Sequence, residues 1–242
     1  MKRKQDGVHT EWYYNGQKQE ETTYKNGKKN GVHTQWYENE QKEEEGTWKD
    51  GKRHGLWTRW YDSGQKKREI TFKDGKVDGL EISWYEDGWY KDGQKKDEFT
   101  WKDGKRDGLW TSWFENGQKK DEGTLKENTG NGIFTSWYEN GQKEFEGTYT
   151  DGKENKFWTR WYENGQKKFE GTYEFGEKDG LWVEWYENGH KKFEGTYKFW
   201  VKDGLWVEWY ENGQKDYEQT YKDGRYVLGS TKVWNEDGSL KE

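Results

Sequence analysis

Four histidines, His9, His33, His54 and His190, are the side chains of this chain that could bind a metal or transfer protons. Either chemistry needs several such groups to converge on one point. His9 and His33 share one position of an internal repeat, whereas His54 lies in a loop and His190 flanks a turn. We therefore expect no shared metal or acid–base site, and no nucleophile–base pair is readable. The sequence predicts no catalytic residue, no metal and no cofactor, and so a protein that is not an enzyme.

Aspartates in one class of loop offer another possible ligand set. The segment Asp103 to Gly108 has the pattern Asp-Gly-x-x-Asp-Gly, which could hold a cation between its two carboxylates. Asp and Gly are also the residues that tight turns require, because they tolerate left-handed backbone angles. We interpret these loops as turns. Cysteine is absent, which excludes disulfides and thiolate metal sites.

The composition bears on the class of partner. Hydrophobic residues are 27% and charged residues 37%, values typical of disorder, but 19% aromatic residues indicate a folded chain. The net charge is −6 with both signs interleaved, and there is no basic block of the kind that binds nucleic acid. No apolar run is long enough to span a membrane, and no apolar segment follows Met1-Lys2-Arg3-Lys4. We expect a cytoplasmic protein.

The elements that must position any site follow from a tryptophan that returns every 24 residues, apart from one step of 29 and one of 25. The series is Trp12, Trp36, Trp60, Trp84, Trp113, Trp137, Trp161, Trp185, Trp209 and Trp234. Such a period is typical of a repeat architecture in which each unit contacts mainly its neighbours. We predict one array of about ten repeats over residues 1–242, with a five-residue insertion near residues 89–93.

Each repeat has the pattern of a β-hairpin. In the repeat that starts at Gly180, runs of aromatic and β-branched residues flank Asn188-Gly189, and Asn-Gly favours a two-residue type I′ turn. A second turn, such as Lys49 to His54, joins each hairpin to the next. The two-residue turn predicts the facing pairs Glu184–Phe193, Val183–Glu194, Trp182–Gly195, Leu181–Thr196, Trp185–Lys192, Tyr186–Lys191 and Glu187–His190.

The predicted fold class is therefore all-β. We expect an elongated repeat protein, an antiparallel meander of about ten β-hairpins that forms a twisted, single-layer open sheet. Glycines should make room for rings on the face that carries Trp182, Tyr186, Phe193 and Tyr197, which we expect to be the inner one. Lysines at the position of Lys191 should pack on tyrosine or phenylalanine rings.

Departures from the repeat mark candidate partner-binding residues. Two loops lose their polar tips and become apolar, which is costly to hydrate and often marks a contact site. One repeat position that is charged in the early repeats becomes aromatic in the later ones. The resulting candidates are Phe175, Phe199, Trp200 and Val201 in the loops, and Phe145, Phe169, Phe193 and Tyr217 at the repeat position. The insertion adds Trp89 and Tyr90, which slippage during repeat evolution explains equally well.

The pattern G-L-W-x-x-W-Y-x-N-G-Q-K-x-x-E-G-x-Y-K-D-G-K resembles the bacterial variant of the MORN repeat, over nearly the whole chain. The clearest matches are Gly108 to Asp121 and Gly180 to Tyr197, while Lys156 and Gly79 to Gly93 depart from it. Proteins of this appearance are grouped as YwqK-like antitoxins, the partners of polymorphic toxins. The resemblance implies a protein-binding module with an open antiparallel sheet, whose partner is another protein, such as a toxin.

Three functions are consistent with these observations. The first is an antitoxin or immunity-type partner that occludes another protein. The second is a structural scaffold or a membrane-apposed, lipid-binding module, because MORN-type repeats are also associated with those roles. The third is a carbohydrate- or cell-wall-binding repeat, because aromatic hairpin repeats of about 20 residues also build such proteins.

Overall fold

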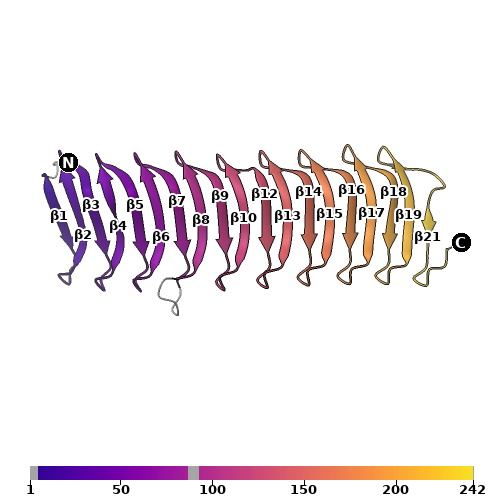
Figure 1. Ribbon diagram of the computed structural model, residues 1–242, viewed down its shortest axis with the longest axis horizontal. Coiled ribbons are helices and arrows are strands. Elements are labelled where there is room, and N and C mark those ends of the chain that lie inside the picture. Colours follow the sequence, from indigo (N-terminus) through magenta and orange to yellow (C-terminus); the bar gives the residue numbers. More distant parts are fainter. Residues whose placement is uncertain (1–4, 87–92, 242) are drawn as a thin grey trace. The chain divides into compact units, whose positions relative to one another are not determined.

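The computed structural model describes residues 5–86 and 93–241, so the candidate residues Trp89 and Tyr90 lie outside the described residues. Within these ranges the chain forms 21 β-strands, antiparallel in one open sheet, and the predicted all-β meander is confirmed (Figure 1). No helix that could cross a membrane occurs in the same ranges.

The strands alternate with short turns and are mostly six to nine residues long. Their bounds are β1 (Gly7–Trp12), β2 (Lys18–Lys25), β3 (Lys28–Trp36), β4 (Lys42–Lys49), β5 (Lys52–Trp60), β6 (Lys66–Lys73), β7 (Lys76–Trp84), β8 (Lys95–Lys102), β9 (Lys105–Trp113), β10 (Lys119–Lys126), β11 (Thr129–Gly130), β12 (Gly132–Trp137), β13 (Lys143–Thr150), β14 (Lys153–Trp161), β15 (Lys167–Glu174), β16 (Glu177–Trp185), β17 (Lys191–Lys198), β18 (Val201–Trp209), β19 (Lys215–Lys222), β20 (Arg225–Tyr226) and β21 (Lys232–Val233).

The chain divides into two compact units. The N-terminal unit comprises Met1–Lys119 and Leu125–Asn128, and the C-terminal unit comprises Lys120–Thr124 and Thr129–Glu242. Within each unit the strands pair in chain order, as β3 with β4 and β4 with β5 in the first, and β16 with β17 and β17 with β18 in the second.

The register of the hairpin of β16 and β17 matches the prediction over most of its length. Gly195 faces Trp182, and the predicted pairs Glu184–Phe193, Val183–Glu194 and Leu181–Thr196 are confirmed. The pairs predicted next to the turn are wrong. Trp185 pairs with Lys191 instead of Lys192, and a bulge between Glu184 and Trp185 shifts the register by one residue. The expected pairs Tyr186–Lys191 and Glu187–His190 are lost with it.

The conformation of the Asn-Gly loop explains this shift. The amide of Gly189 donates to the carbonyl of Tyr186 at 2.9 Å, and the amide of Tyr186 donates to the carbonyl of His190 at 2.8 Å. Gly189 is left-handed, with φ at +87°, but Asn188 is not. The loop therefore has three residues closed by a glycine bulge, in place of a type I′ turn. The Asn188 side chain supports it by accepting from the amide of His190 at 3.0 Å and donating to the Glu211 carbonyl at 2.8 Å.

Two-residue turns with two left-handed residues occur at the other connection of each repeat. Asp50 and Gly51 have φ values of 51° and 81°, as a type I′ turn requires, and Lys49 pairs with Lys52 across them. In the C-terminal unit the same two positions are occupied by Phe199 and Trp200, with φ values of 48° and 72°.

The most deeply buried rings lie on one face of the sheet, which we call the tryptophan face. Trp57 is only 1% exposed, and Trp182 and Trp206 are also buried. Each ring covers a glycine of the preceding strand, because a Cβ atom on Gly195 would stand 2.2 Å from the Trp206 ring. Gly46 lies under Trp57 in the same way. The glycines thus make room for rings, although the ring over Gly195 belongs to Trp206 and not to its facing residue Trp182.

The bulge also changes the partners of the lysines. Lys191 lies 5.7 Å from the ring centre of Trp209 in the next repeat and forms an ion pair with Glu194, so the expected packing on tyrosine or phenylalanine is wrong. Lys192 lies instead 3.0 Å from the carboxylate of Glu184, on the tryptophan face. One extra residue in the strand is enough to exchange the faces of these two neighbours.

Candidate binding sites

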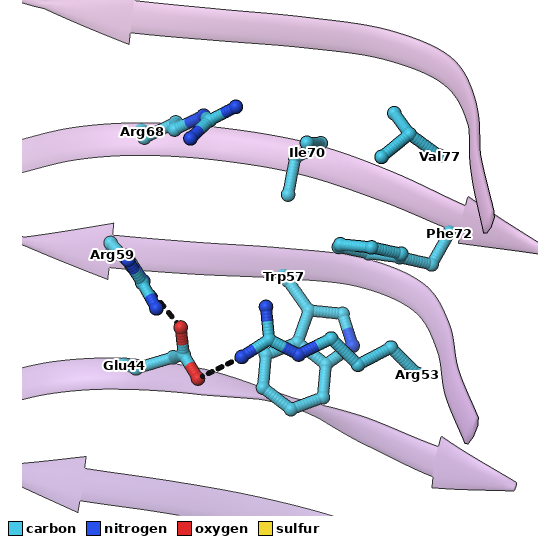
Figure 2. A pocket seen from close by; sticks show the side chains of 8 residues that line it. All are labelled: Glu44, Arg53, Trp57, Arg59, Arg68, Ile70, Phe72 and Val77. Atoms are coloured by element: carbon cyan, nitrogen blue, oxygen red, sulfur yellow. Dashed lines mark hydrogen bonds and ion pairs between the residues drawn. The ribbon is translucent and has the colours of Figure 1, made fainter. Parts of the chain in front are cut away.

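A pocket of about 230 Å³ lies on the tryptophan face of the N-terminal unit (Figure 2). Side chains from four consecutive strands line it. They are Glu44 of β4, Arg53, Trp57 and Arg59 of β5, Arg68, Ile70 and Phe72 of β6, and Val77 of β7. Three guanidinium groups thus meet an apolar wall, and we call this site the arginine pocket.

Glu44 holds two of the arginines in place. Its side chain is 4% exposed, and its two oxygens accept hydrogen bonds from Arg53 at 2.8 Å and from the Nε of Arg59. The guanidinium of Arg53 also lies 4.1 Å from the ring centre of Trp57. Burial lowers the pKa of Arg53, and the positive charges of Arg59 and Arg68 act in the same direction against the opposing effect of Glu44. Positive charge is therefore concentrated at this point of the sheet.

Arg59 and Arg68 face each other directly across β5 and β6. Like charges at facing positions destabilise an antiparallel pair of strands. Each arginine has a carboxylate partner, Glu44 for Arg59 and Glu81 for Arg68, the latter at 2.5 Å. The Glu81 side chain is only 8% exposed, and its Oε2 is buried with no hydrogen-bond partner in the described chain. Two carboxylates thus partly balance three guanidinium groups.

The pocket exists because one repeat lacks the usual ring. In the preceding repeat Trp57 covers Gly46, whereas the equivalent residues here are Glu81 and Ile70, which pair in register. A glutamate side chain is smaller than an indole, so the space beside Ile70 stays open. The sequence pattern did not predict this site. The available signals were a glutamate at a tryptophan position and arginines at two positions that face each other.

His33 is the histidine that the fold buries. It is 2% exposed, and its Nδ1 lies 2.6 Å from the hydroxyl of Thr22 and 3.6 Å from the carboxylate of Glu20. Burial lowers the pKa of His33. Its contacts are those of a packed core residue. Within residues 5–86 and 93–241, no group of three or more His, Asp and Glu is arranged to hold a metal ion.

The predicted loop residues are exposed in the C-terminal unit. Phe175 lies at the turn between β15 and β16, and Phe199 and Trp200 lie at the turn between β17 and β18, with Phe199 71% and Trp200 61% exposed. Val201 follows them and is also exposed. We call these four residues the aromatic loop edge. Their role in partner binding stays a prediction.

The other predicted binding residues lie within strands. Each phenylalanine stacks on a tryptophan of the next strand. The ring centres are 5.1 Å apart for Phe145 and Trp158, 5.5 Å for Phe169 and Trp182, and 5.8 Å for Phe193 and Trp206. Tyr217 donates a hydrogen bond to Gln219 at 3.1 Å. These side chains therefore contribute to the tryptophan face itself, and their part in partner binding also stays a prediction.

The hairpin repeats and the tryptophan face define a class, a β-hairpin repeat protein of the kind used as a binding module. The chain belongs to the MORN repeat variant family. The family model matches more than half of the chain, at residues 5–26, 29–50, 53–74, 106–127, 131–151, 158–174, 178–199 and 202–223. Residues 75–105 lie outside these matches, and they include Glu81 beside the arginine pocket.

Solved structures with detectable similarity are much longer proteins. A crystal structure of TcdB2-TccC3-Cdc42 aligns at a TM-score of 0.23 and 11% identity, covering 93% of this chain and 14% of that chain. A structure of the Photorhabdus luminescens Tc holotoxin pore aligns at a TM-score of 0.22 and 10% identity, covering 94% of this chain and 13% of that chain. The chain aligns with only a small part of each of these proteins, and similarity at TM-scores this low does not indicate a function. No curated protein matches the chain.

Proposed function

We propose that this chain is a non-catalytic protein-binding module that acts as an antitoxin or immunity-type partner and occludes a site on another protein. Membership of the MORN repeat variant family supports a repeat-type binding module. The observation that carries the proposal is the aromatic loop edge of the C-terminal unit. Phe199 and Trp200 are both exposed and both left-handed there.

Phe199 and Trp200 are unfavourable residues for their own turn. The left-handed region costs an L-residue roughly 1–2 kcal/mol, which glycine avoids. Equivalent turns use Asp50-Gly51 or Asp103-Gly104 at these positions. Exposed apolar patches are typical of contact sites, and buried aromatic anchors dominate the energy of many interfaces. The turn does not require Phe199 and Trp200, and their exposure to water is unfavourable. Both facts are expected of residues that a partner covers.

In this proposal the rings of the aromatic loop edge enter pockets on the partner. Exposed charged residues flank the two turns, Glu174 and Glu177 beside Phe175 and Lys198 beside Phe199, and supply a polar rim. Charged rims select among partners and speed association more than they add affinity. Specificity would thus come from the charged rim, and affinity from the rings.

The test uses the product of the gene next to the one that encodes this chain. We expect that product to arrest growth, and co-expression of the wild-type chain to relieve the arrest. Replacing Phe199-Trp200-Val201 with Asp-Gly-Lys should weaken binding of the purified proteins about tenfold or more, since anchor residues contribute about 2 kcal/mol or more. Tyr14→Ser, at a fully exposed ring of the N-terminal unit, is the control. If the loop variant binds as tightly as the wild type, the aromatic loop edge is not part of the interface.

A membrane-apposed scaffold is the second candidate. One repeat position carries an exposed apolar side chain in the first nine repeats, as Val8, Val32, Leu56, Leu80 and Leu109 in the N-terminal unit and Ile133, Phe157, Leu181 and Leu205 in the C-terminal unit. By strand alternation Lys52 shares a face with Leu56, so cations flank this row. Co-sedimentation with phosphatidylserine vesicles, lost on Leu56→Asp, would support this function over the first. The net charge of −6 acts against it.

A further inference from the structure

We propose that the arginine pocket binds a small apolar group that ends in a carboxylate. The candidates for such a group are a free arylalkanoic acid and the C-terminal residue of a peptide. The site lies in the N-terminal unit and shares no residue with the aromatic loop edge, so the two proposals stand or fall separately.

The charge of the site matches a single negative charge. Arg53, Arg59 and Arg68 carry three positive charges, and their partners Glu44 and Glu81 carry two negative ones, which leaves one positive charge unbalanced. A carboxylate is a monoanion, and its planar geometry fits the fork of a guanidinium group.

The two facing arginines form the anion-binding part of the site. Arg59 uses its Nε on Glu44, and Arg68 uses its Nη2 on Glu81. A guanidinium group carries five N–H donors, so both arginines keep donors for a ligand. Their side chains are about half exposed and open to solvent at the pocket. A carboxylate that bridges them would also offset the repulsion between two cations at facing positions. The equivalent arginine in the C-terminal unit, Arg160, faces Phe169 and has no such partner cation.

The apolar wall of the pocket fits the hydrocarbon part of the ligand. Ile70, Phe72 and Val77 line the pocket beside Arg68 (Figure 2). Glu81 stands where the preceding repeat has Trp57, which leaves space for a ligand. Drug-sized ligands occupy sites of roughly 300–1,000 Å³, so a pocket of about 230 Å³ fits one ring or one aliphatic side chain. A hydrocarbon group on this wall places its carboxylate at the arginines.

The experiment compares 3-phenylpropanoate with its uncharged analogue 3-phenylpropanamide, each titrated into the full chain by calorimetry. We expect the acid to bind and the amide to bind at least about tenfold more weakly, because the uncharged amide cannot form charge-assisted hydrogen bonds with the arginines. The chain has three isoleucines, Ile70, Ile82 and Ile133, so methyl-labelled isoleucine reports the place of binding. The Ile70 signal should shift on addition of the acid, and the Ile133 signal should not.

Matched variants test the role of the arginines. Arg59→Gln leaves Glu44 paired with Arg53, and should weaken binding of the acid about tenfold. Arg160→Gln, at the same repeat position in the C-terminal unit, should leave binding unchanged. The double variant Arg68→Gln with Glu81→Gln removes both charges of the second ion pair and keeps the net charge, so it tests Arg68 without leaving Glu81 buried and unpaired. Equal binding of acid and amide, an Ile133 shift without an Ile70 shift, or full binding by Arg59→Gln would overturn the proposal.

Peptides distinguish the two sources of the ligand. A tetrapeptide that ends in phenylalanine with a free carboxylate is compared with the same peptide amidated at its C-terminus. Tighter binding of the free peptide than of 3-phenylpropanoate, with loss on amidation, assigns the pocket to a protein terminus. If the free peptide binds as tightly as 3-phenylpropanoate or more weakly, the pocket is assigned to a free acid.

Discussion

The hydroxyl of Tyr186 donates a hydrogen bond to the main-chain carbonyl of Trp209, 2.9 Å away in the next repeat. The same bond recurs from Tyr37 to Trp60 and from Tyr162 to Trp185. These bonds tie each hairpin to its successor through a side chain, in addition to the strand pairing.

Tyr186→Phe should therefore destabilise the C-terminal unit by about 1 kcal/mol, the usual net contribution of one hydrogen bond. Urea denaturation followed by circular dichroism measures the change. Tyr14→Phe is the control, because that ring is fully exposed. If both variants unfold at the same urea concentration as the wild type, the bond contributes nothing to stability.

Alkaline pH should weaken this type of hydrogen bond where Tyr37, Tyr61 and Tyr162 donate it. Burial raises the pKa of Tyr37, Tyr61 and Tyr162 above their ordinary value of 10.0. A pKa raised on folding means that the stabilisation is complete below about pH 10 and is lost as pH rises through the folded-state pKa values. We expect the free energy of unfolding to fall above about pH 10, in step with tyrosinate absorbance. The triple variant of these tyrosines to phenylalanine should show a shallower fall, and an equally steep fall would assign the loss to other groups.

Gly195→Val should overpack the tryptophan face. A Cβ atom on Gly195 would lie 2.2 Å from the Trp206 ring, so the ring or the strand must move. We expect a loss of about 1–3 kcal/mol. Thr196→Val, a near-isosteric change at the next residue and on the opposite face, is the control. Because repeats couple mainly to their neighbours, hydrogen exchange should increase around β17 and β18 and little elsewhere. Uniform loss of protection throughout the C-terminal unit would contradict this local coupling.

Trp200→Gly should stabilise the protein. Trp200 has φ at +72° at a turn position where Gly51 and Gly224 stand in other repeats. Relief of the left-handed strain is worth roughly 1 kcal/mol, less the greater freedom of glycine in the unfolded chain. Thermal unfolding measures the gain, and Gly51→Ala should show a loss of similar size. A loss of stability in Trp200→Gly would mean that the ring packs on its own sheet.

Part of the fold follows from the sequence because side chains alternate along a strand. The predicted pair Trp182–Gly195 is correct because the bulge at Lys192 offsets the extra residue of the loop, so the pairing beyond it returns to the register of a two-residue turn. The pair Trp185–Lys191 was not predicted, because Asn-Gly also forms a three-residue loop in which only Gly189 is left-handed, and this loop places Trp185 opposite Lys191 instead of Lys192.

The two candidate sites differ in the same way. The aromatic loop edge is visible in the sequence, since Phe199 and Trp200 replace polar turn residues. The arginine pocket was not predicted, because side chains of four strands form it. Arg68, Ile70 and Glu81 each depart from the repeat, but only the register of the strands brings these departures together.

The contacts of Tyr186, Asn188 and Lys191 all reach one repeat ahead, to Trp209 or Glu211. A deletion or duplication of one whole 24-residue repeat therefore leaves each of these side chains with an identical new neighbour. The longer step of 29 residues keeps this series, because the hydroxyl of Tyr85 still donates to the carbonyl of Trp113 at 2.9 Å. The gene can thus lengthen or shorten the protein in steps of one repeat without any compensating mutation, which gives evolution a direct means of matching the extent of this surface to a partner of different size.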